Sequence, residues 1–104
     1  MIHLNTNLFE ELTGGKEAVL VEYHAPWCGY CTRLAPAVEK IRHSFPELVM
    51  GQINVDDEQE LAVKEQIELV PTFVIYQNGE ALGSLVAPES KAMIEEFILR
   101  TLDI

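Results

Sequence analysis

Cysteine is scarce in this sequence. The chain of 104 residues contains only two, Cys28 and Cys31, and two residues separate them. Cysteines so close together cannot cross-link distant segments, which excludes a fold held together by a scaffold of disulfides. In a reducing cytosol such a pair is more often catalytic or metal-binding.

A zinc site is the competing interpretation of the two cysteines. Structural zinc usually takes four protein ligands. The sequence contains no second Cys-x-x-Cys, and only His3, His24 and His43 offer further nitrogen ligands. We therefore expect no metal within one chain, while a site shared between two chains stays open.

Basic residues are also few. Seven lysines and arginines stand against 17 aspartates and glutamates, which gives a formal net charge of −10 at pH 7. Such a chain repels phosphate groups, so we expect it to bind neither nucleic acid nor an anionic membrane surface. The acidic balance favours partners with basic patches, although a well-solvated surface is the simpler interpretation.

Long hydrophobic runs are missing as well. No apolar stretch approaches the roughly 18 residues that a membrane span needs. Residues 1–5 do not join a basic region to an apolar one, so we expect no secretory signal and a cytoplasmic protein, unless a signal has been removed. With 48% hydrophobic residues, the stretch 1–104 is expected to form a single domain with one core.

The order of the expected elements predicts an α/β fold. These elements are a short helix capped by Asn7, a strand over 18–24, a long helix over 28–43, a strand over 48–55, a short helix over 59–66, a hairpin over 72–86 that turns at Asn78-Gly79, and a last helix capped by Ser90. Pro36 lies inside the long helix and is expected to kink it. Alternating helices and strands followed by a hairpin predict a central mixed β-sheet flanked by helices on both faces.

The two cysteines lie where a strand gives way to a helix, and this placement indicates redox chemistry. A thiol at a helix N-terminus lies beside unpaired backbone N–H groups and the positive end of the helix dipole. The pKa of Cys28 is therefore expected to fall below the ordinary value of about 8.5. Cys31, one turn further along, is expected to be less exposed. Such a pair reduces a disulfide when the first thiolate attacks it and the second releases the product.

Four residues near this motif are further candidates. Glu22 has a raised pKa if its strand position is buried, which suits proton exchange with the second cysteine, but an isolated glutamate in a strand is more often exposed. Pro71 follows Val70 and belongs at the first residue of a strand, and the residues leave open whether their peptide bond is cis. Trp27 and Tyr30 offer aromatic surface for a peptide-binding rim or for partial core packing.

Taken together, these residues resemble the active site of the thioredoxin family. The resemblance covers nearly the whole chain, in order and at the expected spacing, and rests on 21–31, Leu34-Ala35-Pro36, Val70-Pro71-Thr72 and 77–80. It implies a thioredoxin fold and a dithiol–disulfide oxidoreductase that needs no bound cofactor. A Cys-x-x-Cys alone is a weak signal, whereas its combination with the helix proline, Val-Pro-Thr and Asn-Gly is specific.

The resemblance also assigns roles to residues of this chain. Cys28 is then the attacking cysteine, Cys31 the resolving one, and the two form the redox-active disulfide. Pro71 matches the family's cis-proline, and Glu22 matches its buried, proton-shuttling acid. The implied substrate-binding residues are Trp27, Gly29, Tyr30, Val70 and Ala87, with Val70 offering its backbone to a bound peptide as an added strand.

The chain departs from the family's pattern at several positions. Gly29-Tyr30 replaces the Gly-Pro of thioredoxin and the Gly-His of protein disulfide isomerase domains, and Glu22 is the residue of isomerase domains where thioredoxins usually have aspartate. Gln52 replaces a lysine often found near the buried acid. Ala87 replaces the glycine that faces the substrate, and Glu89 replaces the isomerase arginine of the last loop. The direction of electron flow is therefore open.

The leading hypothesis is a small cytoplasmic enzyme that reduces protein disulfides. Its partners would be disulfide-containing substrate proteins and a thioredoxin-reductase-type electron donor. We expect the protein to be a monomer. The second hypothesis is an oxidant or isomerase of an oxidising compartment, which Tyr30 between the cysteines favours. The third is a redox-regulated module that binds a partner in a groove between Trp27 and Pro71, although a pure binding protein has little use for Glu22.

Overall fold

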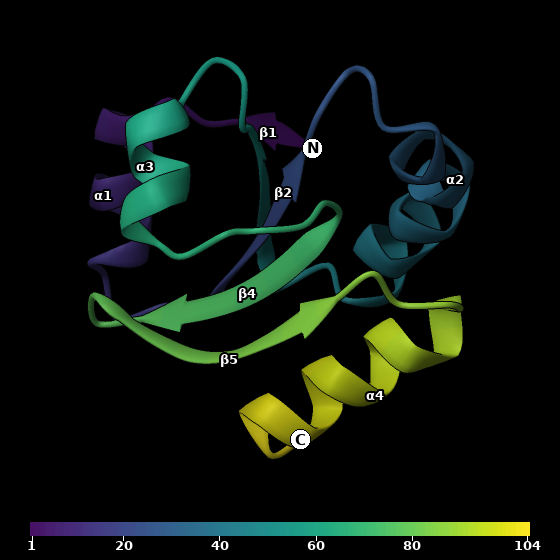
Figure 1. Cartoon of the computed structure of the whole chain (residues 1–104). Helices are drawn as coiled ribbons and strands as arrows, with labels where there is room; N and C mark the ends of the chain where they lie inside the picture. Colours follow the sequence, from purple (N-terminus) through teal and green to yellow (C-terminus); the bar gives the residue numbers. More distant parts are fainter.

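A five-stranded mixed sheet forms the centre of the computed structural model, which describes residues 1–104. Its strands are β1 (Ile2–His3), β2 (Val19–His24), β3 (Val49–Asn54), β4 (Thr72–Gln77) and β5 (Glu80–Val86). They lie in the order β1-β3-β2-β4-β5 (Figure 1). The first three of these are parallel, and β4 and β5 pair antiparallel with their neighbours. The predicted mixed sheet is confirmed.

Helices cover both faces of this sheet. They are α1 (Thr6–Thr13), α2 (Gly29–Ser44), α3 (Gln59–Lys64) and α4 (Lys91–Leu102). α1 and α3 lie on one face, and α2 and α4 lie on the other (Figure 1). The α2 helix continues through Pro36. None of the four combines the length and the apolar character that crossing a membrane requires.

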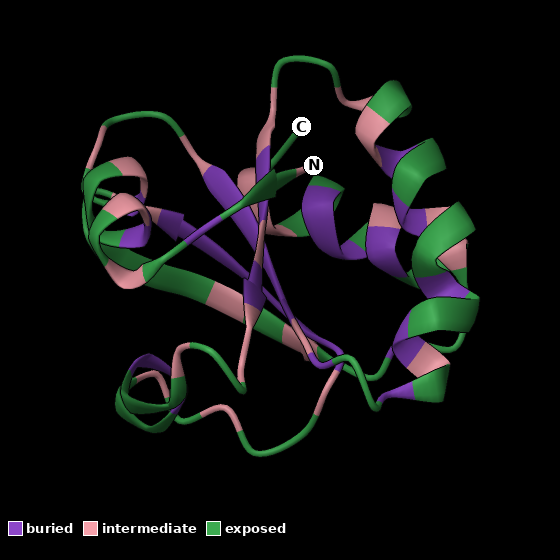
Figure 2. Cartoon of the chain, turned by 90° about the horizontal axis from the view of Figure 1, so that it is seen from above, coloured by how far each residue is buried: buried purple, intermediate pink, exposed green.

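The central strand β2 joins two hydrophobic clusters because its side chains alternate between the faces. Leu20 packs with α2 and α4, whereas Val19, Val21 and Tyr23 pack on the side of α1 and α3. Buried residues therefore follow the sheet and the inner sides of the helices (Figure 2). A fully buried side chain of this kind contributes about 1.5–3 kcal/mol, so β2 is held firmly on both faces.

The structure differs from the prediction in the cap of the first helix, in an additional strand, and at the end of α3, which stops at Lys64 and not at residue 66. The side chain of Asn5, and not that of Asn7, caps α1, because its oxygen accepts a hydrogen bond from the backbone N–H of Leu8 at 2.8 Å. The two-residue strand β1 has too few residues to show a pattern in the sequence, and its pairing with β3 defines it. The predicted turn at Asn78-Gly79 is confirmed, with positive φ angles at both residues.

Candidate active site

The two cysteines form a disulfide at the beginning of α2. Cys28 is the N-cap residue of the helix, and the backbone N–H of Cys31 donates a hydrogen bond to its Sγ at 3.1 Å. An N–H group at a helix N-terminus that points at sulfur stabilises negative charge there. The prediction that Cys31 is less exposed than Cys28 is wrong for this oxidised form, because the bond holds both at 7% exposure.

The loop that precedes β4 lies beside this disulfide. The Val70–Pro71 peptide bond is cis, as the family resemblance implies. The carbonyl oxygen of Val70 lies 3.8 Å from the Sγ of Cys28. The hydroxyl of Thr72 donates to the carbonyl of Leu69 at 2.6 Å and closes this loop.

The loop between β5 and α4 completes the surroundings of the disulfide. The backbone N–H of Ala87 donates to the carbonyl of Pro71 at 2.8 Å. Ala87 is exposed and has a φ of 44°, a conformation that favours glycine. The hydroxyl of Tyr30 donates to the carbonyl of Pro88, and the guanidinium of Arg33 lies 5.4 Å from the centre of the Tyr30 ring. Tyr30 therefore links α2 to this loop.

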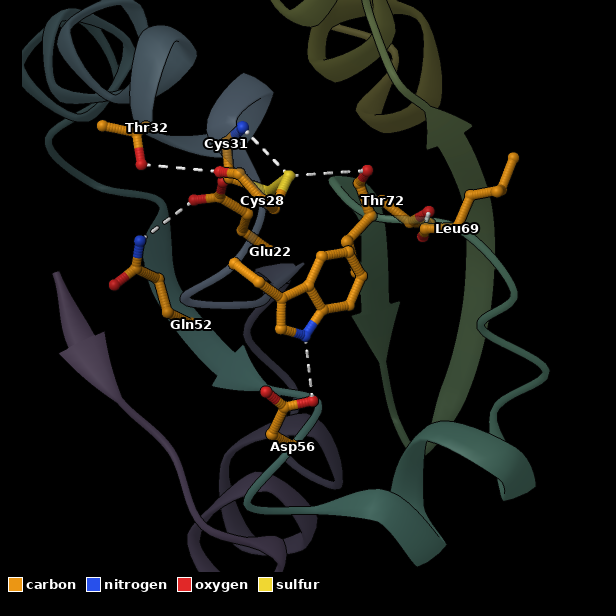
Figure 3. The surroundings of a disulfide bond; sticks show 10 residues. Glu22, Cys28, Cys31, Thr32, Gln52, Asp56, Leu69 and Thr72 are labelled. Atoms are coloured by element: carbon orange, nitrogen blue, oxygen red, sulfur yellow. Dashed lines mark hydrogen bonds between the residues drawn. A yellow bond between two sulfur atoms is a disulfide. The ribbon is translucent and has the colours of Figure 1, made fainter.

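Glu22 is buried on the side of β2 that faces α2. Its side chain is in register with Gln52 of β3, whose Nε2 donates to the Glu22 carboxylate at 3.1 Å (Figure 3). Burial raises the pKa of Glu22 above its ordinary value, and the hydrogen bond from Gln52 opposes this only in part. The exposed position expected for an isolated glutamate is therefore wrong, and the buried acid implied by the resemblance is confirmed at 3% exposure.

Trp27 is the most exposed aromatic residue beside the disulfide. It is 69% exposed, so partial core packing is the wrong interpretation of this residue. Its indole N–H donates to the carboxylate of Asp56 at 3.2 Å. With Leu69 and Val70 it lines a small apolar groove of about 180 Å³. Gly29, the next residue after Cys28, is also exposed.

Two residues of this neighbourhood, Asp56 and Pro88, are not among the candidates that the sequence predicts. Asp56 follows β3, and Trp27 follows the parallel strand β2, so the two ends meet at the same edge of the sheet. The pairing of these two strands would have predicted their contact. The contact of Pro88 uses a backbone carbonyl, for which no residue type in the sequence gives a signal.

Apart from Glu22 and Gly29, the predicted site residues contact the disulfide or its surrounding loops. Glu22 is bonded to Gln52 of β3, and Gly29 is the first residue of α2. No group of three or more histidine, cysteine, aspartate and glutamate side chains is arranged to hold a metal ion. The site therefore consists of a disulfide, a buried carboxyl group and an exposed apolar rim.

Comparisons with known proteins agree with this geometry. The family model described as Thioredoxin matches residues 1–100. The chain is 33% identical over 85 residues to Thioredoxin 1 of Plasmodium falciparum, with 82% of each protein covered. It is 29% identical over 90 residues to a mitochondrial thioredoxin of Mus musculus, with 86% of this chain and 54% of that protein covered. The crystal structure of a Trypanosoma brucei brucei thioredoxin, 22% identical, matches with a TM-score of 0.91 over 100% of this chain and 92% of that one. This last similarity confirms the expected fold.

Proposed function

Since the chain belongs to the thioredoxin family and is a thiol–disulfide oxidoreductase that reduces protein disulfides, we propose that Cys28 is its attacking cysteine and Cys31 its resolving cysteine. The observation that carries this proposal is the disulfide at the N-cap of α2. The N-cap position and the N–H of Cys31 both favour a thiolate at Cys28, which is the nucleophile in disulfide exchange.

The reaction transfers two electrons from the dithiol to the substrate. The thiolate of Cys28 attacks one sulfur of the substrate disulfide, whose S–S bond breaks as a mixed disulfide forms, and the other substrate sulfur leaves and takes up a proton. The thiolate of Cys31 then attacks the Sγ of Cys28, which releases the second substrate sulfur as a thiol. The protein ends as the Cys28–Cys31 disulfide, which is the form that the structure contains.

Glu22 is proposed as the group that accepts the proton of Cys31. Its side chain lies on the face of β2 that α2 covers, and Gln52 orients it there (Figure 3). A carboxyl group with a raised pKa exchanges protons with a thiol more readily than an ordinary one, because the two pKa values are closer. Pro71, Val70, Ala87 and Trp27 are proposed to contact the substrate segment next to its disulfide.

The partners and the compartment of the protein are proposed as well. We propose that the single domain of residues 1–104 works as a monomer in the cytoplasm and that a thioredoxin-reductase-type donor reduces its disulfide again. No bound cofactor is needed for thiol exchange. Fractionation of cells and co-purification of the donor would test this, and accumulation in mitochondria would contradict the cytoplasmic assignment.

Single cysteine variants test the two roles. Cys31→Ser is expected to trap substrate proteins as mixed disulfides on Cys28, because the released thiolate that would resolve them is missing. Cys28→Ser is the matched control and is expected to trap none. The measurement is non-reducing electrophoresis followed by mass spectrometry of the trapped bands. Equal trapping by both variants would refute the assignment.

A second candidate, an oxidant or isomerase, is favoured by Tyr30, whose link to Pro88 makes the start of α2 unlike a Gly-Pro pair. The reduction potential decides between the two directions. A value near that of thioredoxin, about −270 mV, supports the reductase, and a value near that of protein disulfide isomerase, about −180 mV, supports the alternative.

A further inference from the structure

The strand β5 has one face that no helix covers. Leu85 packs in the cluster formed with α2 and α4, and Gly83 lies against Phe97 of α4. Because side chains alternate along a strand, Ser84 and Val86 point to the opposite face. Leu82 lies at a bulge in the pairing with β4 and lines the same hollow as Ser84 and Val86. Leu82 is 42% exposed there and Val86 is 49% exposed. The exposed character of this strand is visible in Figure 2.

A groove of about 390 Å³ lies over this face, between β5 and the segment 65–69 that leads from α3 toward β4. We call it the β5 groove. Leu82 and Val86 line one side and Leu69, which is 63% exposed, lines the other. Val74 and Tyr76 of β4 also line it. The groove thus offers exposed leucine and valine side chains around a hollow large enough for several side chains of a partner.

The β5 groove continues toward the disulfide. Ile67, Glu68 and Leu69 line both this groove and the smaller one beside Trp27 and Val70. Since the carbonyl of Val70 lies 3.8 Å from the Sγ of Cys28, the two grooves form one path that begins at the reacting sulfur. A protein segment whose disulfide lies at Cys28 can therefore extend over Leu69 into the β5 groove.

The path formed by the two grooves carries only negative charge. Its charged lining residues are Glu65 and Glu68, and no lysine or arginine lines either groove. The segment 56–68 contains six acidic residues and a single basic one, Lys64. The ion pairs of the structure are all on α2 and α4, namely Arg42–Glu39, His43–Glu39, Lys91–Glu95 and Arg100–Glu96. The negative charge beside the path is therefore not neutralised by pairing within the chain.

We propose that the β5 groove binds the segment next to the target disulfide of a substrate protein, and that it selects segments carrying both apolar side chains and lysine or arginine. This inference rests on the proposed reductase function and names the class of its substrates. The apolar walls bury leucine-like side chains, and the acidic rim attracts the basic ones. A second copy of the chain is a poor occupant, because each copy has a net charge of −10.

Synthetic peptides of equal length, each closed by one disulfide, test this selection. One carries leucines and lysines beside the disulfide, and the other carries leucines and glutamates. The prereduced protein is mixed with each peptide, and the second-order rate constant is divided by that for the small neutral hydroxyethyl disulfide. We expect the leucine–lysine peptide to react about tenfold faster than the other at low salt, with most of the preference lost at about 0.5 M NaCl.

Two variants locate the effect in the groove. Leu82→Ser is expected to lower the normalised rate for the leucine–lysine peptide about fivefold, and Glu68→Gln about two- to threefold. The controls are Leu99→Ser on α4, because Leu99 is also 42% exposed, and Glu47→Gln, because Glu47 is exposed in the loop between α2 and β3 and lines neither groove. Both controls are expected to leave the normalised rate unchanged.

The outcomes separate this inference from the proposed function. Reduction of both peptides at equal rates, or equal effects of Leu82→Ser and Leu99→Ser, would overturn the groove and leave the reductase intact. Failure to reduce the peptides and hydroxyethyl disulfide would overturn both. Self-association in sedimentation that Leu82→Ser abolishes and Leu99→Ser retains would assign the groove to a second copy and contradict the inference.

Discussion

At the scale of single residues, Ala87 has a backbone conformation that its residue type disfavours. Its φ of 44° places it in the left-handed region, where the Cβ atom crowds the backbone. Its N–H nevertheless donates to the carbonyl of Pro71, so the hydrogen bond holds the loop in this conformation beside the disulfide. The position where the family resemblance implies glycine is thus one where glycine would fit with less strain.

Ala87→Gly is therefore expected to stabilise the protein by about 0.5–1 kcal/mol. Relief of the left-handed strain, about 1–2 kcal/mol, exceeds the extra entropy that glycine loses on folding, about 0.5–1 kcal/mol. The free energy of unfolding in urea measures this. Ala81→Gly is the matched control on β5, since Ala81 is exposed and has no positive φ, and it is expected to destabilise. A loss of stability in both variants would contradict the argument.

Glu22 makes the stability of the protein depend on pH. Burial raises its pKa in the folded state, so the folded chain binds this proton more tightly than the unfolded chain does. The stability that Glu22 contributes is fully present below the pKa of the unfolded chain and is lost as the pH rises through the raised pKa. Glu22→Gln removes this loss, because an amide does not ionise.

The free energy of unfolding of Glu22→Gln, relative to the original protein, is therefore expected to rise between about pH 4 and the raised pKa and to stay level above it. Urea titrations of both oxidised proteins from about pH 4 to about pH 9 give the difference. Glu60→Gln, an exposed change on α3, is the control and is expected to show no comparable rise. A difference that does not change with pH would mean that Glu22 ionises as easily in the folded state as in the unfolded one.

At the scale of elements, the beginnings of the helices connect the sequence to the site. Cys28 caps α2 and Ser90 caps α4, where its hydroxyl accepts from the N–H of Met93. The sequence predicts the Ser90 cap and places Cys28 at the N-terminus of the long helix, and the structure agrees with both. In α1 the cap is Asn5, two residues earlier than the predicted Asn7. The hydrogen bond from the N–H of Leu8 to the Asn5 side chain identifies it.

Alanine substitutions distinguish the two asparagines of α1. Asn5→Ala is expected to cost about 1 kcal/mol, because it leaves the N–H of Leu8 without its partner. Asn7→Ala, inside the helix, is expected to cost nothing or to stabilise slightly, because alanine is the better helix former. Thermal unfolding of both variants measures the difference. A larger loss of stability in Asn7→Ala than in Asn5→Ala would identify Asn7 as the cap and contradict this prediction.

At the scale of the whole molecule, the sequence predicts the local patterns of single strands, turns and helices, and it does not predict the contacts between segments that are far apart in the chain. The apolar run of β2, the Asn78-Gly79 turn and the inner face of α4 are local patterns, and the structure confirms them. The pairing of β1, the bond between Trp27 and Asp56, and the link from Tyr30 to Pro88 join segments that are far apart in the chain. Each of these contacts depends on how the strands of the sheet are arranged, so no local sequence pattern predicts it.

The site follows the same division. Cys28 and Cys31 are recognisable because their chemistry needs a fixed spacing at a helix start. The burial of Glu22 needed the family resemblance, since an acidic residue in a strand is ambiguous until the strand is known to be central. The β5 groove had no signal in the sequence, because it lies between β5 and the segment 65–69, which are apart in the chain.

The central position of β2 has a consequence for the chain as it leaves the ribosome. β2 pairs with β3 on one edge and with β4 on the other, and β4 is synthesised only after α2, β3 and α3. A nascent chain that ends at α3 therefore presents one open edge of β2, together with the apolar residues that β4 and α4 later cover. Open strand edges are templates for aggregation. With this topology, the open edge of β2 must be covered soon after synthesis. Either the β4–β5 hairpin pairs with it quickly, or a chaperone shields it until the hairpin has left the ribosome.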